Sequence, residues 1–222
     1  MSRWHKPSPV PSPGPDPFAL VGGVVRRHPA VTGVSLIGSR ARGKATALSD
    51  WDFRVDNEDP ARVGADLPAL VAPLRPLAAQ WERLSEQATF MLVLPDGVKV
   101  DLFTGGTRAI EPPWAPSSDT LADIDAHAWD WLLWLGGKAL AGRHDFVAAE
   151  LGRFRDHLLG PLGDEAVPTT VAEAVVRYER RRAAAEQRFG VTVDRRLGEV
   201  VTDRLQAAGV VIRGGTGRAP RR

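Results

Sequence analysis

The stretch GSRARGKATALSDWDF, residues 38–53, decides how the rest of the chain is interpreted. It begins with a glycine-serine pair, continues through a basic cluster and ends with two aspartates separated by one tryptophan. In an extended chain Asp50 and Asp52 project from one face, and Trp51 and Phe53 project from the other. Two like charges side by side are unfavourable unless a cation lies between them, and carboxylate oxygens suit Mg²⁺. The stretch therefore predicts a magnesium site beside a phosphorylated ligand.

Composition limits the kind of protein that can carry such a site. The chain has 222 residues, of which 43% are hydrophobic, enough for one large domain or two small ones. It has no cysteine, which excludes disulfides and cysteine-ligated zinc and fits a reducing cytoplasm. No apolar stretch is long enough to span a bilayer, and the N-terminus does not read as a signal peptide. We expect a cytoplasmic protein with no membrane partner.

The charges are nearly balanced, with 29 Lys and Arg against 27 Asp and Glu. Two basic segments, RYERRRAAAEQR and the terminal VIRGGTGRAPRR, are candidates for contact with nucleic acid or acidic protein. Isolated charge runs are more often a solvated helix face or a tail, so nucleic acid is not the expected partner. Nothing in the sequence specifies an oligomeric state.

Hydrophobic periodicity predicts an α+β protein, with a small mixed β-sheet in the first half and an all-α bundle in the second. Strands are expected over residues 30–37, 51–55, 88–94 and 98–103, and helices over 17–28 and 60–84. Three further helical stretches follow, over 121–142, 145–160 and 169–190, and a bundle of three to five helices is expected. The predicted divisions are a proline-rich lead-in (1–16), a sheet domain (17–103), a linker (104–120), a helical domain (121–208) and a basic tail (209–222).

A third carboxylate is expected to join the first two. In the strand over 98–103, alternation places Lys99, Asp101 and Phe103 on one face. If this strand lies beside the strand at 51–55, Asp101 completes a cluster with Asp50 and Asp52. Three acids can hold two Mg²⁺ ions, which would position a nucleoside triphosphate and activate an attacking hydroxyl. That is the chemistry of nucleotidyl transfer.

The glycine-serine turn supplies the other requirement of that chemistry. Gly38 lets the backbone approach phosphates, Ser39 offers donors, and a short helix starting near Arg40 would point its positive end at them. The turn is not a Walker loop, because the GxxxxGK[ST] spacing is absent.

Residues 18–103 resemble the DNA polymerase beta-like nucleotidyltransferase superfamily. The residues that carry the resemblance are Gly38-Ser39, Ala41-Arg42-Gly43, Ser49-Asp50, Asp52 and Asp101. The resemblance implies a minimal nucleotidyltransferase fold in which Asp50 and Asp52 are metal ligands and Asp101 is a metal ligand or the base for the acceptor hydroxyl. It implies that Gly38, Ser39 and Arg42 contact the nucleotide. Trp51 departs from the family, where a smaller aliphatic residue is usual.

A sheet domain followed by helices is similar to small antibiotic-modifying nucleotidyltransferases that act on aminoglycosides or lincosamides. This resemblance implies Mg-dependent transfer of AMP from ATP to a small-molecule hydroxyl, with release of pyrophosphate, and a role in antibiotic resistance. It also implies that Lys138 reaches the triphosphate, although a surface lysine is an equally good interpretation.

Two groups of side chains in the helical half bear on the acceptor. The acids Asp119, Asp123, Asp125 and Asp130 would form an acidic wall that attracts a polycationic aminoglycoside, or they complement a helix dipole. The tryptophans at 129, 131 and 134 are predicted to be core rather than a stacking surface, because their spacing is helical.

Two alternatives to a small-molecule acceptor remain. The acceptor could be a protein, as in antitoxins of the same superfamily that adenylylate a toxin. The chain could also be a non-catalytic module that binds nucleotide or nucleic acid through its basic segments, although clustered carboxylates without a use would only repel one another.

Overall fold

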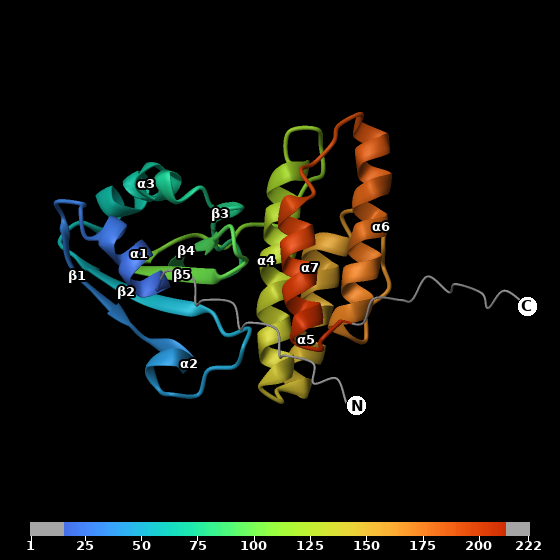
Figure 1. Ribbon diagram of the computed structural model, residues 1–222. Coiled ribbons are helices and arrows are strands. Elements are labelled where there is room, and N and C mark those ends of the chain that lie inside the picture. Colours follow the sequence, from blue (N-terminus) through green and yellow to red (C-terminus); the bar gives the residue numbers. More distant parts are fainter. Residues whose placement is uncertain (1–15, 212–222) are drawn as a thin grey trace, which may run out of the picture.

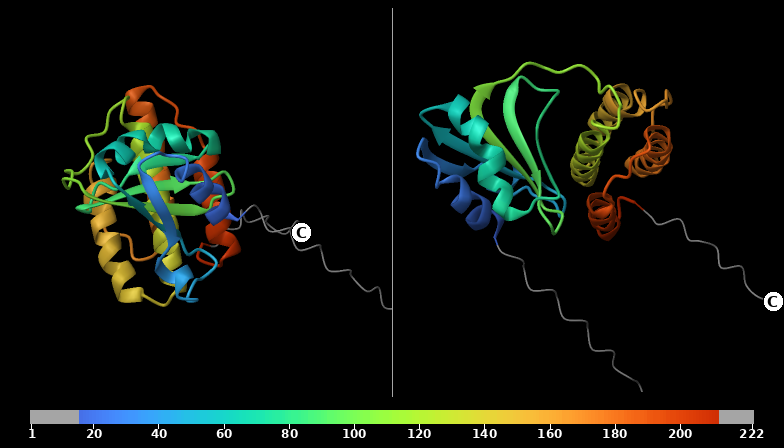
Figure 2. Two further views of the ribbon diagram at one scale, coloured as in Figure 1. Left: turned by 90° about the vertical axis from the view of Figure 1, so that its left-hand side faces the viewer. Right: turned by 90° about the horizontal axis from the view of Figure 1, so that it is seen from above.

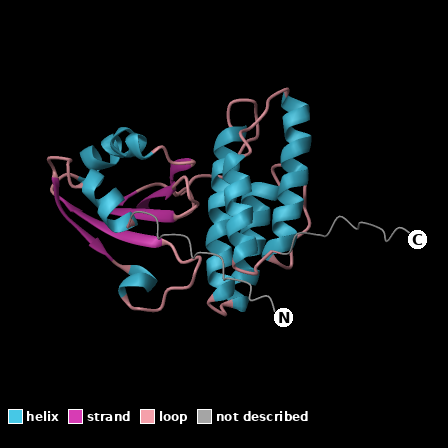
Figure 3. Ribbon diagram, viewed as in Figure 1, coloured by secondary structure: helices cyan, strands magenta, loops and turns pink. Residues whose placement is uncertain are grey.

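The computed structural model describes residues 16–211 and consists of two parts that lie side by side, a β-sheet with its covering helices and a bundle of long helices (Figure 1). Coloured by secondary structure, all strands lie in one part and the longest helices in the other (Figure 3). The α+β prediction is confirmed. Within the described residues, no helix is long and apolar enough to cross a membrane.

The first part contains one mixed sheet of five strands in the order β1-β2-β5-β4-β3. Neighbouring strands are antiparallel except β2 and β5, which run parallel. Its elements in chain order are α1 (Pro17–Val25), β1 (Val31–Leu36), α2 (Gly38–Ala41), β2 (Trp51–Asn57), α3 (Pro60–Val71), a 3₁₀ turn (Ala72–Leu74), β3 (Ala78–Trp81), β4 (Gln87–Val93) and β5 (Lys99–Thr107).

Helices α1 and α3 cover one face of this sheet (Figure 2, right). Phe53 and Val55 of β2 and Val100 and Leu102 of β5 are buried in the apolar core against them. Because side chains alternate along a strand, the intervening residues of β2 and β5 face the other way, toward the helical bundle. The polar face of the sheet is therefore the face that the second part covers.

Sequence features at the helix starts explain these boundaries. The Asp16 side chain accepts a hydrogen bond from the Phe18 N–H and Pro17 follows it, so α1 begins at Pro17. Asp59 and Pro60 begin α3 in the same way. The rest of the lead-in lies outside the described residues.

One predicted element of the sheet half is wrong. The pattern over residues 60–84 predicts a helix with proline interruptions, but the helix ends at Val71, and Ala78–Trp81 form the edge strand β3. Arg75 adopts a left-handed conformation between two prolines, which cannot continue a helix. The chain therefore turns back, and β3 pairs with β4. The strand β5 also continues to Thr107, so it includes residues 104–107 of the segment expected to be a linker.

The second part is built around α4, which contacts α5, α6 and α7 as well as strands β3, β4 and β5. Its elements are α4 (Leu121–Leu140), α5 (His144–Phe154), a π-helical turn (Arg155–Leu159), α6 (Val171–Phe189) and α7 (Arg196–Ala207). The expected bundle is confirmed in the described part of the chain. It continues to Val211, which is buried against the helical core, and the remainder of the expected tail lies outside the described residues.

The ends of α6 follow the predicted signals. The Thr170 side chain accepts a hydrogen bond from the Glu173 N–H, and the Glu173 carboxylate accepts one from the Thr169 N–H. Gly190 ends the helix in the left-handed conformation that glycine adopts most readily. At least one basic residue of this helix is part of the core, because Arg182 is buried and donates a hydrogen bond to Asp125.

Asp125 therefore belongs to the core of the bundle rather than to an acidic wall. Its Oδ1 accepts hydrogen bonds from Trp129, Tyr178 and Arg182 at 3.1, 2.8 and 3.1 Å. Burial is the main cause that raises the pKa of Asp125, and the Arg182 charge opposes it. The expectation that Asp125 faces the active site is wrong.

Asp125→Asn is expected to lower the free energy of unfolding by about 2 kcal/mol, because the buried Arg182 loses its charged partner. Urea denaturation followed by circular dichroism measures this change. The matched control is Asp123→Asn, two residues earlier on an exposed face of α4, which should change stability by less than about 0.5 kcal/mol. Equal effects of the two substitutions would contradict the structural role of Asp125.

Candidate active site

The three aspartates singled out in the sequence converge at the polar face of the sheet. Strands β2 and β5 are parallel neighbours, and their register places Asp52 directly beside Asp101. Asp50 precedes β2, and one carboxylate oxygen from each of the three residues lies within 4.8 Å of the others. Asp50 and Asp101 are buried and Asp52 is half-buried. The expected pairing of the two strands is confirmed.

The electrostatics of this cluster are unfavourable without a cation. Burial, and then the charges of Asp50 and Asp101, raise the pKa of Asp52 to about 7. The lysines at positions 138 and 99 oppose this increase without cancelling it. Carboxylates held together in this way are typical of a site for a hard divalent cation.

Gly38 supports the cluster through close contact with Asp52. Its φ is +70°, and a Cβ atom at this position would lie 1.7 Å from the Asp52 Oδ2. The turn into α2 therefore requires glycine for two independent reasons, the left-handed backbone and the space that the carboxylate fills. Gly38 and the Asp52 carboxylate are thus packed directly against each other.

Gly38→Ala is expected to displace the Asp52 carboxylate and to lower the free energy of unfolding by at least about 2 kcal/mol, since it combines backbone strain with a steric clash. The matched control is Gly43→Ala, because Gly43 also has a positive φ, +65°, but a Cβ atom there would meet nothing within 4 Å beyond its chain neighbours. Thermal denaturation of both variants separates strain from clash. A loss no greater than that of Gly43→Ala would contradict the contact.

A cavity of about 220 Å³ opens beside this turn, and we call it the glycine-serine cavity. Asp50 and Asp52 line it, as do Gly38, Ser39, Arg42 and Lys138. All of the residues expected to contact a nucleotide therefore lie around one space. The Ser39 hydroxyl is buried and has no hydrogen-bond partner among the described residues, so it is available to a ligand in this cavity.

Lys138 reaches this cavity from the helical part. Its Nζ lies 3.7 Å from the Asp50 Oδ2. The two glycines before it allow α4 to approach closely, because a Cβ on Gly137 would lie 2.9 Å from the Leu48 carbonyl oxygen, and one on Gly136 would lie 2.3 Å from Leu205. The GGK sequence therefore brings a cation of the second part against a carboxylate of the first.

Arg40 has a structural role in the same loop. Its guanidinium donates hydrogen bonds to the carbonyl oxygens of Ser49 and Asp50 at 2.7 and 3.0 Å, and it lies over the Trp51 ring at 4.4 Å. The unusual Trp51 thus stacks against the arginine that anchors the loop before Asp52. Arg40 stabilises the position of the carboxylates rather than offering a free charge to a phosphate.

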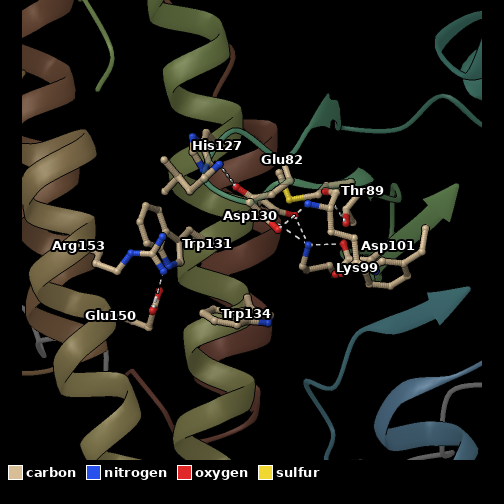
Figure 4. Close-up of a pocket in the computed structure, with 15 residues that line it drawn as sticks. Glu82, Thr89, Lys99, Asp101, His127, Asp130, Trp131, Trp134, Glu150 and Arg153 are labelled. Carbon is tan, nitrogen blue, oxygen red and sulfur yellow. Dashed lines mark hydrogen bonds and ion pairs between the residues drawn. The ribbon is translucent and has the colours of Figure 1, made fainter. Parts of the chain in front are cut away.

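Lys99 lies between the two parts of the molecule and joins them. Its fully buried ammonium group contacts the Asp101 Oδ1 at 2.6 Å and the Asp130 oxygens at 2.8 and 3.0 Å (Figure 4). Burial alone would lower its pKa, but the charges of Asp101 and Asp130 hold it above the ordinary value. Lys99 therefore remains an ammonium ion that links β5 to α4. Asp101 keeps its place beside Asp50 and Asp52 while it makes this ion pair.

A second cavity of about 250 Å³ lies on the other side of Asp101, and we call it the tryptophan cavity. Trp131 and Trp134 of α4 form part of its wall, and Glu82, Asp130 and Glu150 supply carboxylates (Figure 4). Of the acidic run expected to face the site, only Asp130 lines this cavity; Asp119 and Asp123 are exposed. The prediction that the tryptophans are core is confirmed for Trp129 and Trp131, which are buried in the helical core, and Trp134 packs against that core. Trp131 and Trp134 also line a cavity.

Sequence reasoning assigned no role to several residues of this cavity. They are Glu82, Lys99, His127, Glu150 and Arg153. Only Lys99 carried a usable signal, since it lies two residues before Asp101 on the same face of one strand. The others come from the loop after β3 and from α4 and α5, and nothing in their spacing relates them to the aspartates.

The residues present fit a divalent cation. Three carboxylates provide hard oxygen donors at mutual distances that one or two ions can span, and Asp52 carries a repulsion that a cation would relieve. The cluster borders one cavity with an unpartnered hydroxyl and another with aromatic walls. This arrangement can hold Mg²⁺ at the three carboxylates, between a molecule bound in one cavity and a molecule bound in the other.

Comparison with known proteins adds little to this geometry. No protein-family model matches the chain, and no curated protein matches it. Among solved structures, an aminoglycoside 6-adenyltransferase from Bacillus subtilis is similar with a TM-score of 0.33 and 10% sequence identity, over 86% of this chain and 97% of that chain. A similarity of that size supports no conclusion about activity, so the function is argued from the site.

Proposed function

We propose that the protein is a nucleotidyltransferase that transfers AMP from Mg-ATP to a hydroxyl group of a small molecule and releases pyrophosphate. The observation that carries the proposal is the position of the three carboxylates between two cavities. Asp50 and Asp52 line the glycine-serine cavity, and Asp101 lines the tryptophan cavity. A phosphate group and a hydroxyl group bound on either side would meet at the cluster.

The glycine-serine cavity suits the triphosphate. The Ser39 hydroxyl and the cations Arg42 and Lys138 lie around it, and these are the groups that bind phosphate oxygens. Mg²⁺ held by Asp50, Asp52 and Asp101 would neutralise charge on the phosphate oxygens. The role of this chain is to bind the phosphates in one orientation and to keep the carboxylates aligned through Gly38 and Arg40.

The tryptophan cavity suits the acceptor. In the transfer, the acceptor oxygen bonds to the α-phosphorus, the bond from that phosphorus to the pyrophosphate oxygen breaks, and the hydroxyl proton passes to a base. Of the three clustered aspartates, Asp101 is the one that borders this cavity, so it is the proposed base. Its position is held by Lys99.

The lining of the tryptophan cavity supports an aminoglycoside-like acceptor. Glu82 adds negative charge, Glu150 is paired with Arg153 at 2.9 Å, and the half-buried Trp134 can contact a sugar ring. A role in antibiotic resistance would follow from such an acceptor.

Purified protein incubated with α-labelled ATP, Mg²⁺ and a panel of aminoglycosides and lincosamides tests the proposal. The expected result is an adenylylated product and one pyrophosphate for each product molecule. The same reaction without an added acceptor but with a cell extract tests the protein alternative, since label on a polypeptide would favour it. Absence of any labelled product and of ATP turnover in both reactions would exclude nucleotidyl transfer.

A further inference from the structure

A chain of contacts fixes the orientation of one histidine in the wall of the tryptophan cavity. The Arg83 guanidinium forms an ion pair with Glu111 at 2.6 Å and lies over the Trp114 ring at 3.6 Å. The Trp114 Nε1–H donates a hydrogen bond to the His127 Nδ1 at 3.0 Å. The segment between the sheet and the bundle is thereby attached to α4 at His127.

This hydrogen bond determines the tautomer of the imidazole. An indole N–H can only donate, so the His127 Nδ1 must be the unprotonated nitrogen. Burial, with the charges of Arg83 and Lys99, lowers the pKa of His127 to about 3, so the ring is neutral. A neutral imidazole carries one proton, and here that proton is on Nε2.

His127 lines the tryptophan cavity, and Nε2–H is the one polar group of its ring that Trp114 does not contact. His127 is only 2% exposed and stacks on Trp131 with a centroid distance of 5.5 Å and an interplanar angle of 16°. This stacking and the hydrogen bond from Trp114 hold the ring in one orientation in the wall of the cavity, where Figure 4 labels it. Among residues 16–211 the Nε2 makes no hydrogen bond, and it is not one of the fully enclosed polar atoms that lack a partner, so it is not sealed off from solvent. A donor that is open to a cavity and has no protein partner is available to a ligand atom.

We propose that His127 is a specificity-determining residue whose Nε2–H donates a hydrogen bond to a neutral oxygen of the acceptor molecule. The assignment rests on the proposed function, because it takes the tryptophan cavity as the acceptor site. Because Nε2 carries the proton while Trp114 donates to Nδ1, His127 cannot accept a hydrogen bond from the acceptor, so an ammonium group at this point is disfavoured. Ammonium groups of the acceptor instead lie near Glu82, which lines the same cavity, because the Asp130 oxygens are paired with Lys99.

The tautomer is tested first, on the full chain without ligand. Long-range ¹H–¹⁵N correlation of the five histidine rings distinguishes the two neutral tautomers and the imidazolium ion. His127 is expected to remain neutral and protonated at Nε2 between about pH 5 and 8. Trp114→Phe, which removes the donor to Nδ1, is expected to give a mixture of tautomers. A protonated Nδ1, or an imidazolium ion at pH 6, in the unsubstituted protein would overturn the proposal.

The recognition of an oxygen is tested with kanamycin and its singly deoxygenated analogues as probes, in isothermal titration calorimetry. One analogue is expected to bind about tenfold more weakly than kanamycin to the unsubstituted protein, because its binding leaves the donor unpaired. His127→Phe, which keeps an aromatic ring on Trp131, is expected to bind kanamycin as weakly as that analogue and to discriminate between them less than twofold.

The outcomes separate this proposal from the proposed function. Binding of kanamycin that His127→Phe leaves unchanged overturns the role of His127 alone. Absence of binding by every probe overturns the acceptor class and this assignment together. ATP turnover with no adenylylated acceptor would instead count against the proposed transfer, whatever the tautomer of His127. Thermal denaturation of His127→Phe, expected within a few degrees of the unsubstituted protein, excludes loss of folding as the cause.

Discussion

Asp52→Asn is expected to lower kcat/KM for adenylyl transfer by at least about 10³-fold, while the protein stays folded. The carboxylate is one of three proposed Mg²⁺ ligands, and loss of several kcal/mol of charge stabilisation corresponds to a rate change of that order. Initial rates with labelled ATP and a saturating acceptor measure it. Asp56→Asn is the matched control, because Asp56 lies on the same strand but is exposed and paired with Arg54 at 3.1 Å.

The same substitution has a second expected effect that needs no acceptor. Removing one negative charge relieves the repulsion among the three carboxylates, so Asp52→Asn should raise the melting temperature in the absence of divalent ions. Mg²⁺ should raise the melting temperature of the unsubstituted protein and of Asp56→Asn, because it binds the folded state, but not that of Asp52→Asn. Equal Mg²⁺ shifts in all three proteins would contradict a metal site at this cluster.

Lys99→Met is expected to lower the free energy of unfolding by about 3–5 kcal/mol. It leaves the buried carboxylates of Asp101 and Asp130 facing each other without the ammonium ion between them. Urea denaturation measures the loss. Lys44→Met is the matched control, since Lys44 is exposed and should contribute less than about 0.5 kcal/mol.

A double variant shows whether the loss comes from this particular triad. Lys99→Met combined with Asp130→Leu removes the second uncompensated charge, so it should recover at least about 1 kcal/mol relative to Lys99→Met alone. A double variant whose two losses simply add would show that Lys99 and Asp130 do not interact. Lys99→Arg keeps the charge but not the size, and it is expected to retain part of the stability.

The sequence alone was sufficient for the features that depend on local periodicity. Alternation along two short strands predicted that Asp50, Asp52 and Asp101 would share a face, and the register of β2 with β5 places them together. Proline and glycine positions predicted most of the helix ends. The edge strand β3 was missed, because AAQW has no strand pattern of its own and becomes a strand only by pairing with β4.

The remaining parts of the site depend on contacts between the two halves, which no local pattern encodes. Lys99 meets Asp130 across 31 positions of sequence, and His127 receives its hydrogen bond from a tryptophan in an irregular segment. The acids of the bundle that were expected to form one wall point to different places, because each contacts a different element. Asp125 contacts Arg182 in the helical core, and Asp130 contacts Lys99 of the sheet. Backbone periodicity determined which carboxylates are together, whereas the packing of α4 against the sheet decided what surrounds them. The physical reason is that strand alternation acts over neighbouring residues, but a buried charge or donor takes its partner from whatever element packs against it.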